Sequence, residues 1–508
     1  MKKKKFLSLL LIFAAIFLVI VISGLSGYFF SAPLESADVS ETEAQPASES
    51  LNVTTTVPTT TTTAVTTAAP TTAATAAADR ITITITGDMI NVRSGADSNS
   101  PKIGSASKGE VFDYLSQATD EHGTLWYEIQ FTGSTTGWIA GKYGKKSATD
   151  SPKSPKATEL PSSPQSNVNR IAKKYNAVGL QVAVIDNGKV TGTYNYGYAT
   201  KDTKKMATDI KIRIASISKV AVAVNAMKMQ EQGIVDINTQ IGEYWGAKLP
   251  KSVTLKNLLT HTSTLKRLGY IATKADTLKQ LKRGASYGNK TVGASDSWAY
   301  NNYAIGVAGS TLELASKQSL DSFAKTNVFT PLDMDASFWP GALSKTNKLA
   351  TLYAASGNVS RSVSSSKRMT GSSKPGSNIN AFAGGLTCSA EDLAKMVAML
   401  ANNGEYNGVR VLTPASVAAL EEKFFAKTEN GGSFIQCLTL RYKDNLYGES
   451  ELYYHTGHAF GVLALMSYNP ATGDGVVVVS TGASIRRDSQ GVYAVCSEIT
   501  EYMYKNVI

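Results

Sequence analysis

The chain has 508 residues, 43% of them hydrophobic, so it has room for about two or three domains and enough apolar residues for a sizeable core. This composition excludes a wholly disordered protein. The formal net charge is +11 and no stretch resembles a nucleic-acid module, so the charge favours an acidic surface, such as a bacterial envelope, over nucleic acid as a partner.

A lysine-rich start is followed by a long apolar run. Four of the first five residues are lysines, residues 6–22 are apolar except for Ser8, and residues 24–30 extend the run. A membrane-spanning helix needs about 20 residues, whereas the apolar part of a cleaved signal has about 7–15. We therefore expect residues 1–30 to form a single-pass anchor, with cytoplasmic lysines and everything after Phe30 outside the cell. The alternative is a cleaved signal and a secreted protein.

The next segments alternate between low-complexity and strand-forming sequence. Residues 31–79 are rich in Thr, Ala and Pro and lack periodicity, which predicts a disordered stalk. Residues 81–85 alternate as a half-buried strand does, and further strand-like runs separated by Gly and Ser clusters follow up to Ala140. This spacing predicts a small β-barrel over residues 80–144.

Motifs within this barrel resemble the bacterial SH3-like domain. They are Ile90-Asn91-Val92-Arg93-Ser94-Gly95, Ile103-Gly104, Trp126-Tyr127 and Thr136-Gly137-Trp138-Ile139. Domains of this family commonly bind cell-wall peptides, so the resemblance implies a ligand-facing cluster of Trp126, Trp138 and Tyr143. The other interpretation places these aromatic side chains in the barrel core; we favour it for Trp138, and it stays open for Trp126.

A second linker precedes the largest domain. Residues 145–166 are rich in Pro, Ser and Lys and are expected to be extended and basic. Residues 182–196 predict a hairpin around Asp186-Asn187-Gly188, and residues 461–480 predict two more strands, followed by a helix over 490–506. Strands at both ends with helical sequence between them predict an α+β domain over 167–508, with an antiparallel sheet flanked by helices.

The cysteines and histidines restrict the chemistry. Cys388, Cys437 and Cys496 are odd in number and have no motif spacing, so we expect buried structural residues and no disulfide framework. With four histidines and no cluster of ligand residues, we expect no metal mechanism. The sequence also lacks a glycine-rich phosphate loop, and we expect no cofactor.

A serine and a lysine three residues apart stand at the start of a predicted helix. Ser216 and Lys219 precede the apolar stretch 220–229, and residues three apart share a helix face. A helix start favours developing negative charge, and burial would lower the lysine pKa enough for it to accept the serine proton. The pattern alone is common, because a lysine also follows three residues after Ser105, Ser263, Ser322 and Ser364.

Two more motifs follow in the same domain. Tyr300-Asn301-Asn302 precedes the apolar run 304–309. Polar residues at the start of a helix that is expected to be buried indicate a functional role. His455-Thr456-Gly457-His458 lies on the strand that leads to Gly461, where a glycine allows close approach of a ligand. Ser-x-x-Lys, Tyr-x-Asn and His-Thr-Gly rarely occur together by chance.

With these motifs, the domain resembles the serine β-lactamase and penicillin-binding-protein superfamily. The branch is that of class C β-lactamases, D-alanyl-D-alanine carboxypeptidases and related esterases, and the likeness covers essentially all of 167–508. Residues 258–263 and 383–393 are close to further family signatures. The resemblance implies that Ser216 is the acylated nucleophile, Lys219 its proton acceptor and Tyr300 a second acid/base that protonates the leaving amine.

The resemblance also implies the substrate contacts. Asn302 would hydrogen-bond the substrate amide, and His455, Thr456 and Gly457 would line the carboxylate end. The backbone N–H groups of Ser216 and His458 would form an oxyanion hole, in which each donor typically contributes about 10²–10³ in rate. His261 is interpreted as a structural residue that holds a turn below the site.

Three features differ from the usual family pattern. Thr264 stands where the family usually has glycine, which bears on a turn and leaves the chemistry intact. The Ser/Lys-rich segment 356–378 is an insertion that could alter access to the site. The third motif often begins with lysine; the histidine form is found among D,D-peptidases, which favours a peptidase over a dedicated β-lactamase.

The sequence as a whole predicts a membrane-anchored extracellular serine hydrolase. Its acyl-enzyme would form on D-alanine-type cell-wall peptides, and its SH3-like domain would hold it at the peptidoglycan. One alternative is a β-lactamase or esterase that acts on small molecules with the same fold. The other is an inactive hydrolase domain that serves as a cell-wall-binding protein.

Overall fold

The computed structural model describes residues 80–88, 90–132, 135–149, 163–269 and 273–508. All of them lie in one compact unit, Ala76–Ile508. The predicted anchor (1–30) and stalk (31–79), and residues 150–162 of the predicted linker, lie outside the described residues. Within those ranges, no helix combines the length and apolar character that crossing a bilayer requires.

Residues 80–149 form a small all-β domain with its own core. Its sheet has the order β3-β2-β6-β5-β4-β1-β7, with antiparallel pairing. Alternating residues such as Ile83, Ile85 and Ile129 are fully buried in this core, as the strand pattern predicts. The last strand pairs along β1 as far as Thr149, so the domain extends beyond residue 144. The strands are β1 (Arg80–Ile85), β2 (Ile90–Arg93), β3 (Lys102–Ala106), β4 (Val111–Thr119), β5 (Leu125–Thr132), β6 (Thr135–Ala140) and β7 (Gly144–Thr149).

Residues 163–508 contain an antiparallel sheet, as predicted, with the order β10-β9-β8-β22-β21-β20-β19-β18-β17. The predicted hairpin joins its first two strands through Asn187 and Gly188, whose φ values are 49° and 73°. The ends of the domain meet where β8 pairs with β22 from Gly179↔Thr481 to Ile185↔Gly475. The strands are β8 (Gly179–Asp186), β9 (Lys189–Thr200), β10 (Lys204–Lys205), β17 (Phe425–Glu429), β18 (Gly432–Gln436), β19 (Arg441–Leu446), β20 (Glu449–Ala459), β21 (Val462–Asn469) and β22 (Asp474–Thr481).

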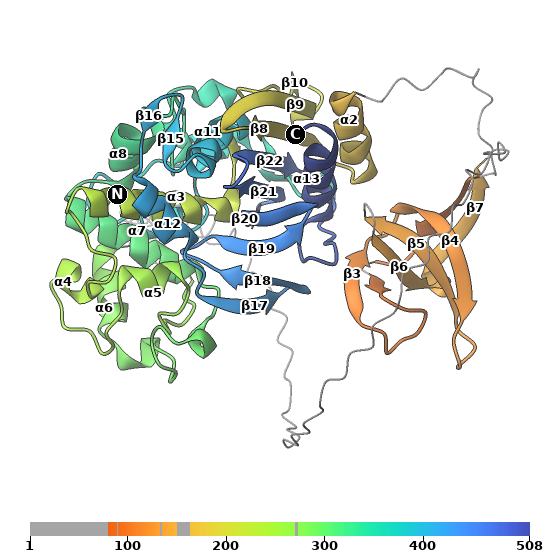
Figure 1. Cartoon of the computed structure of the whole chain (residues 1–508), viewed down its shortest axis with the longest axis horizontal. Helices are drawn as coiled ribbons and strands as arrows, with labels where there is room; N and C mark the ends of the chain where they lie inside the picture. Colours follow the sequence, from red (N-terminus) through yellow and green to blue (C-terminus); the bar gives the residue numbers. More distant parts are fainter. Residues whose placement is uncertain (1–79, 89, 133–134, 150–162, 270–272) are drawn as a thin grey trace, which may run out of the picture. The chain divides into compact units, whose positions relative to one another are not determined.

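Helices cover both faces of this sheet (Figure 1). Alternate strand residues explain the arrangement: Val182 and Val478 pack with α2 and α13, whereas Ala183 and Val477 pack with the helices of the other face. The helices are α2 (Pro164–Lys174), α3 (Ser218–Glu231), α4 (Ile241–Trp245), α5 (Leu255–Leu259), α6 (Lys274–Leu281), α7 (Asn302–Ser316), α8 (Leu320–Ala324), α9 (Val363–Lys367), α10 (Ile379–Phe382), α11 (Ala390–Ala401), α12 (Pro414–Glu421) and α13 (Ala494–Asn506). The predicted C-terminal helix thus begins at Ala494 rather than at residue 490.

Smaller elements complete the domain. Helix α3 is buried along most of its length, as expected for a central helix that is apolar all round. It begins at Ser218, and Ser216 lies just before it in the 3₁₀ turn η2 (Ala215–Ile217).

Short strand pairs lie outside the main sheet: β11 (Ile212–Arg213) with β14 (Thr387–Cys388), β12 (Leu352–Tyr353) with β13 (Val359–Arg361), and β15 (Glu405–Tyr406) with β16 (Val409–Arg410). All three cysteines are free and buried, which confirms their predicted structural role.

The Ser/Lys-rich segment 356–378 is fastened to α7 by a buried carboxylate. Glu313 accepts hydrogen bonds from the Gly376 backbone N–H and the Asn378 side-chain amide, both at 2.8 Å. The Leu320 N–H also donates to it, at 3.1 Å. Burial raises the pKa of Glu313 to about 7, against the lowering effect of these donors.

Candidate active site

The predicted nucleophile and base lie in direct contact. The Lys219 Nζ is 3.0 Å from the Ser216 Oγ and 2.7 Å from the Ala383 carbonyl oxygen. The lysine side chain is fully buried, whereas Ser216 is only half-buried and remains open to a substrate. The sequence therefore predicted both members of the pair and their mutual geometry.

The surroundings of Lys219 favour its neutral form. Burial lowers the pKa of Lys219 well below its usual value, and the nearby Arg441 cation lowers it further. The Glu429 carboxylate acts in the opposite direction. A neutral amine in contact with a hydroxyl can accept its proton, so this geometry and this pKa shift suit a general base.

The backbone around Ser216 is held against β20. An added Cβ on Gly457 would lie 2.5 Å from the Ile214 carbonyl oxygen and 3.4 Å from the Ala215 Cβ, so only glycine permits this approach. Ala215 itself has a φ of 50°, an unfavourable conformation for a residue with a side chain. The glycine of the predicted His-Thr-Gly motif thus serves close packing beside the nucleophile.

Tyr300 lies beside the Ser216–Lys219 pair. The Lys219 Nζ lies 4.8 Å from the centre of the Tyr300 ring. Burial raises the pKa of Tyr300 to about 12, partly offset by the nearby Ser216 side chain. The phenol therefore keeps its proton at neutral pH and can donate it to a departing amine.

His261 supports Tyr300, in agreement with its predicted structural role. Its ring centre is 4.6 Å from that of Tyr300, and its Nδ1 accepts a 3.2 Å hydrogen bond from the Asn301 N–H. Asn301 caps α7 through Ala304, so the predicted Asn302 becomes the first residue of the helix, where it is exposed. Thr264 has a φ of 57°, which explains why glycine suits this turn and confirms that the departure is structural.

The predicted substrate strand runs past this cluster. β19 pairs with β20 up to Arg441↔Tyr454, and the next β20 residue is His455. His455 is buried, with Nδ1 2.7 Å from the Thr456 carbonyl oxygen; burial, followed by the Arg441 charge, lowers its pKa well below the usual value. It is therefore neutral. Thr456 is half-buried and His458 exposed, so both are accessible.

Arg441 is a site residue that the sequence reasoning missed. It is 8% exposed, and its Nη2 lies 2.5 Å from a Glu429 carboxylate oxygen. Its charge lowers the pKa of Lys219 and of His455, which places it beside both motifs. A single arginine directly after Cys437-Leu438-Thr439-Leu440, a mostly apolar stretch, was the available signal. Lacking any motif, this arginine could not be distinguished from a surface charge.

The other serines of the Ser-x-x-Lys pattern have different partners. Ser263 Oγ accepts from the Leu265 N–H, Ser322 Oγ accepts from Ser319, and Ser364 Oγ contacts Ser362. Ser105 lies on β3 of the small domain. Among the serines compared, Ser216 is the one that contacts its lysine, and that lysine is buried.

The predicted aromatic cluster of the small domain is only partly assembled. Trp126 is 4% exposed and donates to Asp120 at 2.9 Å, which agrees with the core interpretation, yet it also borders a hollow of about 310 Å³. Tyr143, 38% exposed, lines the same hollow and lies under the Lys142 amine. Trp138 is half-buried on β6, outside this hollow.

Comparison with known proteins agrees with this geometry. Residues 165–494 match the Beta-lactamase family, and residues 88–145 match the Bacterial SH3 domain family. Penicillin-binding protein 4* of Bacillus subtilis is 26% identical over 30% of this chain and 36% of its own length. D-alanyl-D-alanine-carboxypeptidase/endopeptidase AmpH of Escherichia coli is 28% identical over 32% of this chain and 46% of its own length. The chain thus spans less than half of each of these relatives.

A solved structure shows the same fold. The Beta-Lactamase/D-Alanine Carboxypeptidase from Pseudomonas syringae superposes with a TM-score of 0.54 at 16% identity. The match covers 67% of this chain and 96% of that protein.

Proposed function

The chain belongs to the Beta-lactamase family and carries a bacterial SH3 domain, and on that premise we propose that it is a serine hydrolase acting on D-alanine-type peptides of the cell wall. Members of this fold family are serine hydrolases, and the curated relatives named above include a D-alanyl-D-alanine-carboxypeptidase/endopeptidase. The observation that carries the proposal is the buried Lys219 amine, 3.0 Å from the half-exposed Ser216 hydroxyl.

The proposed reaction begins with proton transfer from Ser216 to Lys219. The serine oxygen attacks the substrate carbonyl, and the resulting oxyanion is held by the backbone N–H groups of Ser216 and His458. Tyr300 then gives its proton to the leaving amine, the carbon–nitrogen bond breaks, and an acyl-enzyme remains on Ser216. The proton on Lys219 passes to Tyr300, which restores the neutral amine and the neutral phenol. Water then attacks the ester carbonyl while Lys219 accepts a proton from the water, and this proton passes to the Ser216 oxygen as its bond to the acyl carbon breaks.

The position and charge of Arg441 favour a peptide substrate that ends in a carboxylate. A C-terminal D-alanine presents this group to the end of β20 where His455 and Thr456 lie, and a guanidinium is well suited to bind it. His455 is neutral there, so Arg441 supplies the positive charge. A simple ester lacks the carboxylate, which favours the peptidase over the esterase alternative.

We also propose that the SH3-like domain and the N-terminal segment determine where the enzyme acts. The domain would hold the enzyme at the peptidoglycan, and residues 1–30 would anchor it in the membrane with the hydrolase domain outside. Protease treatment of intact cells tests the topology: release of the hydrolase domain, with a small N-terminal fragment left in the membrane, is the expected result. A mature chain that lacks residues 1–30 would show a cleaved signal.

Intact mass measurement of the full chain tests the chemistry. Incubation with penicillin should add one acyl group, Ser216→Ala should prevent it, and a D-alanyl-D-alanine peptide should be turned over. If the folded protein hydrolyses only a short ester through Ser216, the site is correct and the substrate is wrong. If neither reagent acylates it, the cell-wall-binding alternative replaces the enzyme.

A further inference from the structure

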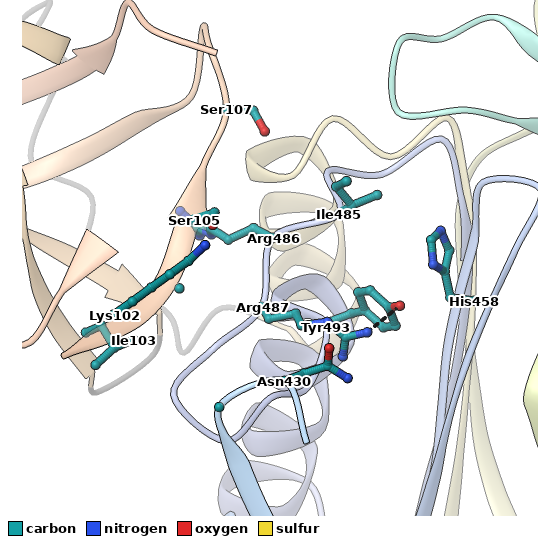
Figure 2. A pocket seen from close by; sticks show the side chains of 12 residues that line it. Lys102, Ile103, Ser105, Ser107, Asn430, His458, Ile485, Arg486, Arg487 and Tyr493 are labelled. Atoms are coloured by element: carbon teal, nitrogen blue, oxygen red, sulfur yellow. Dashed lines mark hydrogen bonds between the residues drawn. The ribbon is translucent and has the colours of Figure 1, made fainter. Parts of the chain in front are cut away.

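A pocket of about 460 Å³ lies between strand β3 and the end of β20 (Figure 2). Lys102 and Ser105 of the SH3-like domain line one side, and His458, Arg487 and Tyr493 of the hydrolase domain line the other. Both domains belong to the same compact unit of the chain. The pocket is therefore a feature that neither domain forms alone.

Buried polar groups hold the two domains together beside the pocket. Arg486 is 3% exposed, and its guanidinium carbon lies 4.4 Å from the ring centre of Phe112 and 4.7 Å from that of Phe131. Ser484 donates a 2.5 Å hydrogen bond to the Glu110 carboxylate, which is also buried. Separating the domains would deprive these buried polar groups of their partners, which costs free energy, so these interactions stabilise the contact between the domains.

Gly104 lets β3 approach the hydrolase domain closely. An added Cβ would lie 2.7 Å from the Arg487 carbonyl oxygen and 2.4 Å from a Phe131 ring carbon. Any larger residue would push the strand away from this loop. The glycine thus keeps Lys102 and Ser105, its neighbours on β3, at the rim of the pocket.

The pocket is connected to the nucleophile through β20. His458 lines the pocket, with its ring centre 5.3 Å from that of Tyr493. The preceding residue, Gly457, packs on the backbone that leads into Ser216. Arg441 and His455 lie toward the opposite end of this segment, where the leaving group is proposed to bind. A ligand group in the pocket therefore belongs to the acyl side of the scissile bond.

The chemistry of the pocket favours an anion. Lys102 and Arg487 line it, and its described lining residues include no carboxylate. Arg486 also lines it, but its charge is paired with the buried Glu110 carboxylate at 3.9 Å. The Arg487 guanidinium is oriented by a 2.6 Å hydrogen bond to the Tyr493 hydroxyl, with its carbon 4.0 Å from the centre of that ring. Ser105 and Ser107 add hydroxyl groups. Cations combined with hydroxyl donors are suited to a carboxylate.

We propose that this pocket is an extended substrate site, built jointly by the two domains, for a carboxylate on the acyl portion of the peptide cleaved at Ser216. The inference rests on the proposed function and deepens it. The SH3-like domain then contributes to substrate selection as well as to attachment.

The test compares two acyl-D-alanyl-D-alanine peptides that differ only in having a free carboxylate or its amide on the acyl portion. Lys102→Glu should lower kcat/KM for the carboxylate peptide about tenfold, because it replaces attraction by repulsion, and should change the amide peptide far less. Lys108→Glu is the matched control: it is exposed in the same domain, outside the pocket, and should leave both values unchanged.

Binding provides a readout that is independent of turnover. In a Ser216→Ala background, Lys102→Glu should weaken the Kd of the carboxylate peptide by the same factor. Equal losses for both peptides, or equal effects of Lys102→Glu and Lys108→Glu, would overturn the inference. Failure of penicillin and of both peptides to acylate the unaltered protein would instead overturn the proposed function, while the Kd comparison still decides the role of the pocket.

Discussion

The Lys219 amine lies 2.7 Å from the carbonyl oxygen of Ala383, the residue that ends helix α10. This contact holds the amine nitrogen independently of its contact with Ser216. The carbonyl accepts a hydrogen bond from the amine in either protonation state, so the nitrogen would stay in place as it gained and lost a proton in the proposed reaction.

Lys219→Ala should slow acylation of Ser216 by roughly 10²–10⁴, the range of general-base catalysis. Stopped-flow measurement with a fluorescent penicillin gives the rate. Lys325→Ala is the control, because it alters the lysine of the Ser322 pair, whose serine bonds Ser319. Since burial lowers the pKa of Lys219, the wild-type rate should reach its alkaline plateau well below the ordinary lysine pKa. A profile that still rises beyond pH 10 would contradict this.

Tyr300→Phe should lower kcat for the peptide while KM changes little, because proton donation acts in the transition state. Tyr303→Phe is a matched control: that tyrosine is buried on the same helix start, and its hydroxyl has no hydrogen-bond partner among the described residues. Its loss should leave both constants unchanged. Steady-state kinetics with a D-alanyl-D-alanine peptide measures both, and equal effects of the two substitutions would exclude the acid role.

Arg441→Lys should raise KM for a peptide with a free C-terminal carboxylate, because lysine keeps the charge but loses the planar two-pronged donor. The same peptide with a C-terminal amide should bind weakly to both proteins. Glu429→Gln keeps the size of the side chain and removes the carboxylate that competes with the peptide carboxylate for Arg441. This substitution should therefore not weaken peptide binding. A KM that is insensitive to Arg441→Lys would place the carboxylate elsewhere.

Tyr143→Ala should weaken sedimentation of the full chain with purified peptidoglycan at low salt, where electrostatic attraction is least screened. Tyr143 is 38% exposed beside the hollow near Trp126, so its loss costs little stability. Val111→Ala, at a 50% exposed position on β4, is the control and should sediment as the unaltered chain does. Equal sedimentation of all three proteins would remove this hollow as the attachment site.

Glu313 should make stability depend on pH. Its pKa is raised from 4.5 to about 7 by burial, so the folded state binds more protons than the unfolded state between these values. Stability should therefore fall by about 3 kcal/mol as pH rises through that window, and then level off. Chemical denaturation at pH 5 and pH 8 measures this. Glu313→Gln should flatten the difference, and an unchanged slope in that variant would exclude Glu313 as its source.

Local patterns predicted most of the fold and the contact between Ser216 and Lys219. Hairpin turn residues and alternating strands depend on neighbours in sequence, so Asn187-Gly188 and the barrel strands could be recognised directly. Ser216 and Lys219 were separated from similar pairs by the order of motifs along the chain. The start of α3 was placed two residues early, because the pattern did not reveal the turn that carries Ser216.

Non-local contacts were beyond reach of the sequence. Arg441 enters the site because β19 pairs with β20, and its partner Glu429 comes from a different strand. The 356–378 segment gave no sign of its attachment to Glu313, which is distant along the chain. Likewise, β7 lacks the hydrophobic alternation of a strand, and its pairing with β1 shows that the barrel continues into the basic sequence.

The pairing of β8 with β22 has a consequence for biogenesis. The centre of the sheet joins Gly179 to Thr481, so it cannot close until almost the whole chain has been synthesised. During synthesis, the β8–β9 hairpin exposes an open edge that can pair with another chain. We therefore expect chains truncated before Asp474 to aggregate rather than to accumulate as a smaller stable domain.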